Sequence, residues 1–483
     1  MNRKLYWLMA AASSFAVATA AQAQEGVDAP VEQAETTSDS AAELEFLKAQ
    51  VEALQAQVTQ LAGQVKKAEP SWKGAPQWAD KDAGWSFKLR GRFMYDAAYI
   101  EDPGLTFAQD SGQLGFSSRV RRARLGVEGT MPGNFAYKAE ADFASSGGST
   151  DEVSWADVFI EYKNPNGFMA RVGHFETFQS LEQITSSRHS TFIERAMMNE
   201  AFGHGRRLGF AVGWENADIL FRAGMFNDTI NGDLNNDEWL FGARLVYAPK
   251  WGNNQLHFGL NYQHREYSAS ALNFRYRARP FLQTTGVRFV DTNTFAAKSD
   301  NVFGVEAAGV FGSLHATAEA QWVKPSTLGT TYVAKPSETV ATNRLLKDPS
   351  FMSFYAEVGY WLTGETRGYK KGEWDRTKVL NGFDKGGFGA VGINLRYDYL
   401  DLADSDLYAG GVGTSTSRGG KQTGILASII WQPIDYVRIT TQVAHTMVEG
   451  GPFASTVKST SSNPVQDRKY NFDSVAVRFA YDF

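Results

Sequence analysis

The chain has 483 residues and a formal net charge of −5, with 48 basic and 53 acidic residues and no cysteine. The absence of cysteine excludes disulfides, thiolate metal ligands and a thiol nucleophile, and the mild acidity argues against a nucleic-acid partner. After residue 23 there is no run of eighteen apolar residues, which excludes a membrane protein built from spanning helices. Spanning strands are not excluded, because their apolar residues alternate with polar ones.

The N-terminus has the order of a secretory signal. Arg3 and Lys4 precede an apolar run over residues 5–20, and the small-x-small triplet Ala21-Gln22-Ala23 follows. This order predicts a signal peptide over residues 1–23 that is cleaved on export. The alternative is an N-terminal membrane anchor, but the run is too short and too rich in alanine and serine to span well. The Glu-, Ala- and Thr-rich residues 24–40 read as a flexible linker.

Residues 41–69 carry the seam of a coiled coil. Seven apolar residues recur at alternating spacings of three and four: Leu44, Leu47, Val51, Leu54, Val58, Leu61 and Val65. We predict a periplasmic coiled-coil helix that joins copies of the chain, the alternative being a lone amphipathic helix lying on a barrel or a membrane. Valine and leucine at the two seam positions favour two strands, whereas the barrel predicted below favours trimers. Residues 70–84 are expected to be a second linker.

From residue 85 to the C-terminus the apolar pattern has a period of two. In the first segment, Trp85 and Phe87 alternate with Lys88 and Arg90, and segments of about ten residues repeat this pattern up to Phe483. Nearly every segment has full charges on its polar face and aromatic residues at its ends. This predicts an all-β fold, a transmembrane antiparallel barrel over residues 85–483 whose apolar face lies in lipid.

The connections also alternate in length. Short turns, such as residues 131–134 and 432–435, separate long segments at 97–117, 175–205, 269–301, 324–350, 401–420 and 448–469. Short periplasmic turns and long external loops are typical of such barrels. The count is about sixteen strands, but residues 363–388 are too long for a periplasmic turn, so the count there could change by two.

No catalytic constellation and no metal-binding spacing is apparent among the seven histidines, so we expect no enzyme, no cofactor and no metal. Arginine is the informative residue. Arg275, Arg277 and Arg279, named here the arginine triplet, alternate strictly, so an extended segment would place all three guanidiniums on one side. Such a row can bind anions and pass them along. The alternative is a basic stripe on an external loop that binds lipopolysaccharide.

The strands add further candidates for a charged pore lining. The basic ones are Arg90, Arg92, Arg122, Arg124, Arg222 and Arg244, and the acidic ones are Glu128, Glu140, Asp142, Glu306 and Glu319. Side-chain parity places Arg122 and Arg124 in the lumen and Arg119 and Arg121 at the rim. Part of this set could instead form structural salt bridges. Because both signs of charge are present, anion preference is a hypothesis here.

Three stretches resemble the phosphate-selective porin O/P family. They are RVRRARLGVEGTMPGNFAYKAEADF (119–143), RVGHFETFQSLEQITSSRHSTFIERAM (171–197) and LTGETRGY (362–369) followed by RYDYLDL (396–402). The resemblance implies a trimeric sixteen-stranded barrel whose third and fifth external loops fold inward. It also implies phosphate or polyphosphate transport along an arginine ladder, with lysines near the constriction. The arginine triplet looks like that ladder, but the third loop (175–205) offers no lysine.

The sequence therefore predicts an outer-membrane porin of a Gram-negative bacterium, a passive water-filled channel that prefers small anions such as phosphate. One alternative is a general small-solute diffusion porin without strong selectivity. Another is a structural or adhesion barrel plugged by its loops. The expected partners are small anionic solutes, outer-membrane lipid, lipopolysaccharide and further copies of the chain in a homotrimer, with no nucleic acid.

Overall fold

The computed structural model describes residues 36–68, 70–72, 74–105, 114–144, 153–231, 238–252, 254–267, 272–336, 338–341, 343–405, 407, 419–457 and 464–483. The chain divides into two compact units, Met1–Ala68 and Glu69–Phe483. The predicted signal peptide and residues 24–35 of the predicted linker lie outside the described residues. In the ranges that are described, no helix is both long enough and apolar enough to cross a membrane.

The first unit contains one helix, α1 (Thr36–Ala68). The predicted N-terminal helix is therefore confirmed, although it begins five residues earlier than expected and includes residues 36–40 of the predicted linker. The seam residues from Leu44 to Leu61 are all exposed in the single chain. The pairing of this seam with other copies stays a prediction.

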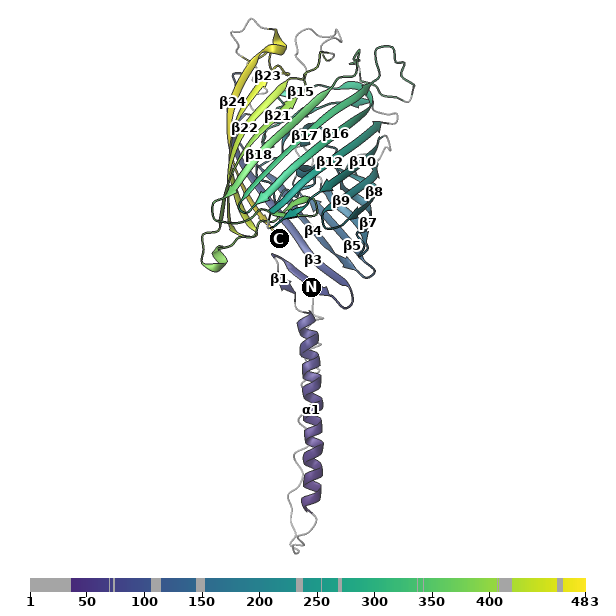
Figure 1. The fold of residues 1–483 in the computed structure, drawn as a ribbon, viewed down its shortest axis with the longest axis vertical. Helices are drawn as coiled ribbons and strands as arrows, with labels where there is room; N and C mark the ends of the chain where they lie inside the picture. The colour runs from purple at the N-terminus through teal and green to yellow at the C-terminus, as the bar shows by residue number, and fades with distance from the viewer. Residues whose placement is uncertain are drawn as a thin grey trace, which may run out of the picture. The chain divides into compact units, whose positions relative to one another are not determined.

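The second unit is a closed antiparallel barrel of sixteen strands, as predicted (Figure 1). The strands are β3 (Trp85–Ile100), β4 (Gly115–Met131), β5 (Phe135–Asp142), β6 (Ser154–Lys163), β7 (Phe168–Glu176), β8 (Arg206–Glu215), β9 (Ile219–Phe226), β10 (Glu238–Tyr247), β12 (Asn254–Tyr267), β16 (Phe295–Phe311), β17 (Leu314–Thr327), β18 (Phe351–Trp361), β21 (Ala390–Asp401), β22 (Lys421–Ile434), β23 (Val437–Glu449) and β24 (Lys469–Asp482). β24 pairs with β3 and closes the barrel. Closure satisfies the backbone hydrogen bonds of both terminal strands, as a hydrocarbon environment requires.

The predicted linker over residues 70–84 is instead two short strands, β1 (Ser71–Trp72) and β2 (Pro76–Asp80). β2 pairs with the first four residues of β3, from Trp85 to Lys88. β24 ends at Asp482, opposite Arg92, so the beginning of β3 needs another partner for its backbone groups. β2 is that partner.

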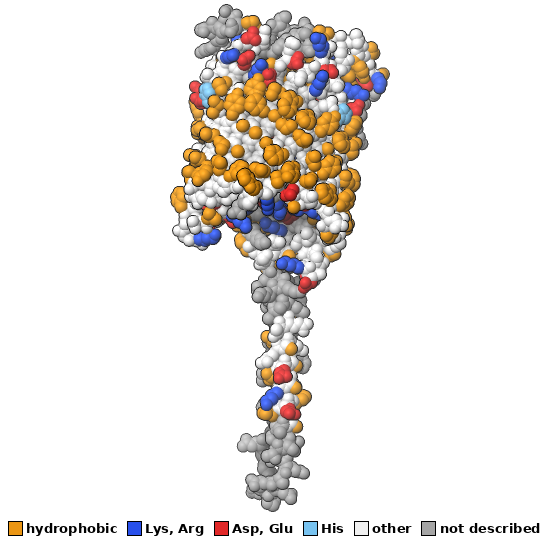
Figure 2. Space-filling view, in the orientation of Figure 1, with side chains coloured by type: hydrophobic (Ala, Val, Ile, Leu, Met, Phe, Trp, Pro, Cys, Tyr) orange, Lys and Arg blue, Asp and Glu red, His pale blue; other side chains and the backbone are white. Residues whose placement is uncertain are grey.

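The outward face of the barrel is apolar. Figure 2 shows hydrophobic side chains as a band across the visible face of the barrel, with charged side chains gathered above and below it. Strands far apart in the sequence have exposed apolar residues, such as Phe93, Leu125, Val172 and Leu395. These side chains are stable in lipid and would be costly in water.

Shorter elements connect the strands. They are α3 (Leu181–Ile184), α4 (Met197–Ala201), β11 (Lys250–Trp251), β13 (Asn273–Phe274), β14 (Arg277–Ala278), β15 (Val290–Asp291), β19 (Gly368–Lys370), β20 (Glu373–Asp375), η1 (Phe383–Lys385) and η2 (Val465–Asp467). Loop 3 (residues 177–205) and loop 5 (residues 272–294) fold inward. Phe192 of loop 3 and Phe289 of loop 5 share one apolar core with inward-facing wall residues such as Phe351, Leu400 and Phe472. This core fills part of the barrel interior.

The long segment between β18 and β21 also enters the barrel, from the end that carries the short turns. β18 and β21 pair directly with each other, so the segment adds no strand to the wall and the count remains sixteen. Its strands β19 and β20 form a small hairpin, named here the inner hairpin (residues 368–375). The amide of Trp374 donates to Thr185 of loop 3 at 3.2 Å, and Arg244 of the wall donates to the carbonyl of Gly372 at 2.9 Å.

Candidate functional site

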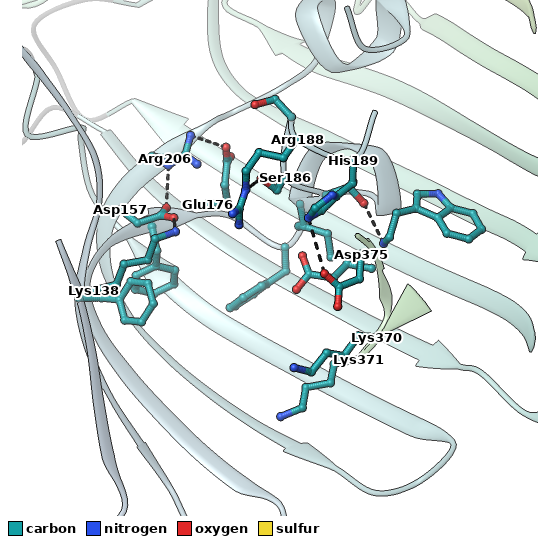
Figure 3. Close-up of a pocket in the computed structure, with 18 of the residues that line it drawn as sticks. Lys138, Asp157, Glu176, Ser186, Arg188, His189, Arg206, Lys370, Lys371 and Asp375 are labelled. Atoms are coloured by element: carbon teal, nitrogen blue, oxygen red, sulfur yellow. Dashed lines mark hydrogen bonds and ion pairs between the residues drawn. The ribbon is translucent and has the colours of Figure 1, made fainter. Parts of the chain in front are cut away.

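A cavity of about 550 Å³ lies between the wall strands β3–β10, loop 3 and the inner hairpin (Figure 3). Fourteen basic side chains line it: Arg90, Arg92, Arg122, Arg124, Lys138, Lys163, Arg171, Arg188, Arg195, Arg206, Arg222, Arg244, Lys370 and Lys371. Seven acidic side chains line it as well: Glu128, Asp157, Glu161, Glu176, Glu215, Glu373 and Asp375. The lining therefore has a surplus of seven formal positive charges, which raises the local concentration of anions.

A β-bulge determines how the arginines of β4 are placed. β4 has one more residue than β3 at Arg121, and the register shifts there. Arg121 therefore faces inward and binds Glu194 of loop 3 at 2.7 Å, while Arg119 donates to the carbonyl of Gln283 in loop 5 at 2.8 Å. Both side chains therefore contact the inward loops, because a bulge changes the alternation of faces along a strand, and their place at the rim stays a prediction.

The basic and acidic candidates on β3–β5 lie together and pair with each other. Three arginines and three carboxylates form this lattice, in the pairs Arg90–Glu128, Arg92–Glu140 (3.6 Å), Arg124–Glu140 (3.1 Å) and Arg124–Asp142 (2.7 Å). Arg122 is buried beside Met94 and forms no ion pair within the part of the chain that the structure describes. Four members of these salt bridges, Arg90, Arg92, Arg124 and Glu128, also line the cavity.

The remaining wall candidates divide into two groups. Arg222 pairs with Glu215 on the cavity surface. Arg244 lines the cavity as well and pairs with the buried Glu306 at 2.6 Å. Glu319 lies away from the cavity and accepts the amide hydrogens of Leu181 and Glu182, each at 2.9 Å. Glu306 and Glu319 therefore have structural roles. Glu306 fixes the side chain of Arg244, and Glu319 holds the first turn of α3 in loop 3.

The arginine triplet lies in loop 5 and does not line the cavity. Its residues alternate with the buried Tyr276 and Ala278, so the three guanidiniums share one side of the segment. Arg275 binds Asp291 at 2.5 Å and Arg279 binds Glu200 of loop 3. The triplet thus presents a basic row at loop 5, outside the enclosed part of the interior.

The sequence analysis did not identify the lysines of the site. Two of them, Lys370 and Lys371, are at the tip of the inner hairpin, where Lys371 and Gly372 adopt positive φ angles of 51° and 78° in a tight turn. Lys371 binds Glu215 at 3.1 Å, and Lys370 forms no ion pair in the described ranges. A Lys-Lys-Gly turn between Tyr369 and Trp374 is a recognisable hairpin signal. The length of residues 363–388 alone does not reveal this hairpin.

Burial and nearby charges perturb two carboxyl groups outside the spanning strands. Burial acts to raise the pKa of Glu194, but the guanidiniums of Arg121 and Arg478 hold it well below its ordinary range. Burial raises the pKa of Glu373 to about 7, with Asp375 acting in the same direction and Arg244 opposing it. The charge of the cavity lining therefore changes near neutral pH at Glu373.

A closed sixteen-stranded barrel with an apolar outer band and a charged interior narrowed by inward loops is the architecture of a porin. The chain belongs to the family of phosphate-selective porins O and P, whose model matches residues 87–483. It is therefore an outer-membrane channel protein, and both family and fold point to a channel rather than an enzyme.

The chain is also similar to individual proteins and solved structures. The chain is 27% identical over 394 residues to Porin O of Pseudomonas aeruginosa, covering 76% of this chain and 84% of that one. It is 35% identical over 383 residues to an uncharacterized protein of Caulobacter vibrioides, covering 77% and 70%. Among solved structures, it is similar to OmpT of Vibrio cholerae (TM-score 0.47, 12% identity, 84% and 99% covered). It is also similar to the anion-selective porin from Comamonas acidovorans (TM-score 0.46, 12% identity, 82% and 100% covered).

Proposed function

We propose that this porin conducts small anions in preference to cations, with phosphate or polyphosphate as the transported solute. The observation that carries the proposal is the lining of the cavity, where fourteen basic side chains face seven acidic ones. A cavity lined mainly by one sign of charge concentrates counter-ions and lowers the barrier to their passage.

The ion-paired arginines remain able to bind anions. A guanidinium has five N–H donors, and a carboxylate partner occupies two of them at most. Arg122 and Lys370 form no ion pair in the described part of the chain, so no carboxylate competes directly with a solute for their N–H donors. In this proposal, an anion passes from the arginine triplet and the arginines of β4 to the lysines of the inner hairpin. Spaced sites of this kind allow transfer without deep trapping.

Two other functions remain candidates. A general diffusion channel is favoured by the seven acidic side chains of the lining, several of which neutralise their arginine neighbours directly. A structural barrel plugged by its loops is favoured by the apolar core that loops 3 and 5 form inside the wall.

Planar-bilayer recording separates the three functions. Stepwise conductance is expected from either channel, and its absence would favour the structural barrel. Under a tenfold KCl gradient the reversal potential should have the sign of chloride permeation. A cation-selective or neutral reversal potential would overturn the anion proposal. Micromolar to millimolar phosphate should reduce the chloride current if phosphate is a preferred solute.

For the assembly, we propose a homotrimer that is exported with a cleaved signal peptide (residues 1–23) and is surrounded by outer-membrane lipid and lipopolysaccharide. We also propose that α1 forms a parallel periplasmic coiled coil with the other copies. If Leu44 occupies heptad position a, Glu43 and Lys48 fall at positions g and e, five residues apart. In a parallel, in-register bundle these positions on neighbouring helices face each other with opposite charges.

A further inference from the structure

A second, smaller recess adjoins the cavity at Arg188 and Asp375. It extends between loop 3, the segment after β18, and the wall strands β18, β22 and β23. The residues that matter for its chemistry are Trp361 on β18, Arg367 in the segment that follows, and Arg438 on β23. The two elements that narrow the barrel interior on this side, loop 3 and the segment after β18, therefore meet the wall at this recess.

The recess has more positive than negative charge. Arg188, Arg367 and Arg438 line it, and Asp375 is the acidic residue among its lining groups. Asp482, which binds Arg188 at 3.4 Å, is shared with another arginine, and so is Glu357, which binds Arg367 at 2.9 Å. Arg438 donates to the backbone carbonyls of Arg188 and Ser190 and has no carboxylate partner in the described ranges.

Two hydrogen-bond donors in this recess are buried without an acceptor. The indole Nε1–H of Trp361, whose side chain is 4% exposed, and the Nε–H of Arg438 have no partner within the described part of the chain. Both groups can only donate. A water molecule could accept from both and donate to oxygens of the lining such as those of Thr377 and Gln432, but it would leave the positive charge of the three guanidiniums without compensation. An anion accepts from both donors and also offsets the positive charge.

The size of the recess limits the anion. The centre of a water-sized sphere can move through only about 10 Å³ of it, which is room for one water molecule or one monatomic ion. Inorganic phosphate, with four oxygens around its phosphorus, is too large. We propose that this recess binds a single chloride ion, held by the N–H groups of Trp361 and Arg438 between the guanidiniums of Arg188 and Arg367.

A chloride ion at this place is a structural component and not a transported solute. It joins Arg188 of loop 3 and Arg367 of the segment after β18 to the wall. It therefore fixes the position of both elements that narrow the cavity. The proposal does not depend on the selectivity of the channel, because the ion occupies a recess beside the main cavity and is held there by buried donors.

Bromide replaces chloride and is visible by its anomalous X-ray scattering. Crystals of the full-length porin grown in sodium bromide should show an anomalous peak within hydrogen-bond distance of Trp361 Nε1. The absence of a peak in the recess, with bromide visible elsewhere, would overturn the proposal and assign the site to water. This result is independent of any conductance measurement, so it separates failure of the chloride site from failure of the proposed anion selectivity.

The Trp361→Phe substitution removes one donor and keeps an aromatic ring, and Trp322→Phe on the outward face of β17 is the matched control. The thermal unfolding temperature of the wild-type protein should rise with chloride relative to gluconate at equal ionic strength. The half-saturating chloride concentration should increase about tenfold in Trp361→Phe, the cost of one hydrogen bond to a charged group, and stay unchanged in Trp322→Phe. An equal chloride response in all three proteins would refute the site. If Trp361→Phe does not fold, the bromide peak in the wild-type protein decides.

Discussion

The Glu373→Gln substitution removes a negative charge from the cavity and keeps the size of the side chain. Glu373 lines the cavity from β20, and its carboxylate forms no hydrogen bond or ion pair in the described part of the chain, so glutamine breaks no side-chain contact there. Because burial raises the pKa of Glu373 to about 7, the wild-type carboxyl is mainly charged at pH 8.5 and mainly neutral at pH 5.5. The positive surplus of the lining therefore increases by one charge as the pH falls through 7.

The size of the effect follows from the dimensions of the cavity. A sphere of 550 Å³ has a radius of about 5 Å. A unit charge at about 5 Å from an ion changes its energy by about 0.8 kcal/mol in water, and screening at 0.1 M salt lowers this to about 0.5 kcal/mol. Loss of the Glu373 charge should therefore raise the anion occupancy of the cavity about two- to fourfold.

The assay is the reversal potential in planar bilayers at pH 8.5 and pH 5.5. The anion-to-cation permeability ratio of the wild-type channel should rise about two- to fourfold on acidification. Glu373→Gln should have the acidic value at both pH values, and Asp384→Asn, an exposed acid of the same segment, should behave like the wild type. A pH response that persists in Glu373→Gln would assign the titration to another group and refute the reasoning.

Three further predictions concern other parts of the molecule. Replacing the arginine triplet by alanine should raise the phosphate concentration needed to block chloride current about tenfold, since charge-assisted hydrogen bonds are lost; unchanged block would place the triplet outside the conduction path. Arg478→Ala should lower the free energy of unfolding by about 3–5 kcal/mol, measured by denaturant titration in lipid, because the buried Asp96 would lose its arginine partner and Glu194 would keep only Arg121; a loss below about 1 kcal/mol would contradict this. In the cysteine-free chain, Leu54→Cys should form a disulfide between copies and Ala53→Cys should not, as gel electrophoresis would show. At most two chains in three can be linked in a trimer, so complete linkage would indicate a dimer.

The barrel itself could be predicted from the sequence because the same physical constraint acts on every strand. Each strand has one face in lipid and one face in a polar interior, so alternation appears sixteen times and no single error removes it. Trp85 and Phe87 on the first strand and Tyr481 and Phe483 at the end of the chain have the same pattern. The ion pairs among Arg124, Glu140 and Asp142 could likewise be anticipated, because parity places these residues on one face.

The parts that could not be predicted depend on single local events. The bulge at Arg121 inserts one residue into β4 and brings Arg119 and Arg121 to the inward face, and no residue type in the sequence marks it. The inner hairpin depends on a turn at Lys371 inside a segment that parity rules do not cover. β2 pairs with the part of β3 that β24 does not reach, and this depends on how the two ends of the barrel meet.

The contacts of Arg478 have a consequence for the order of assembly. Arg478 is on the last strand, and it binds Asp96 on the first strand at 2.6 Å and the carbonyl and carboxylate of Ile193 and Glu194 in loop 3. The pairing of β24 with β3, which closes the barrel, therefore also completes the contacts that hold loop 3 in place. Until the C-terminal strand is in place, loop 3 has its contacts with Glu319 and Glu357 of the wall but lacks those with Arg478, so the narrowed channel reaches its final form only when biogenesis of the wall is finished.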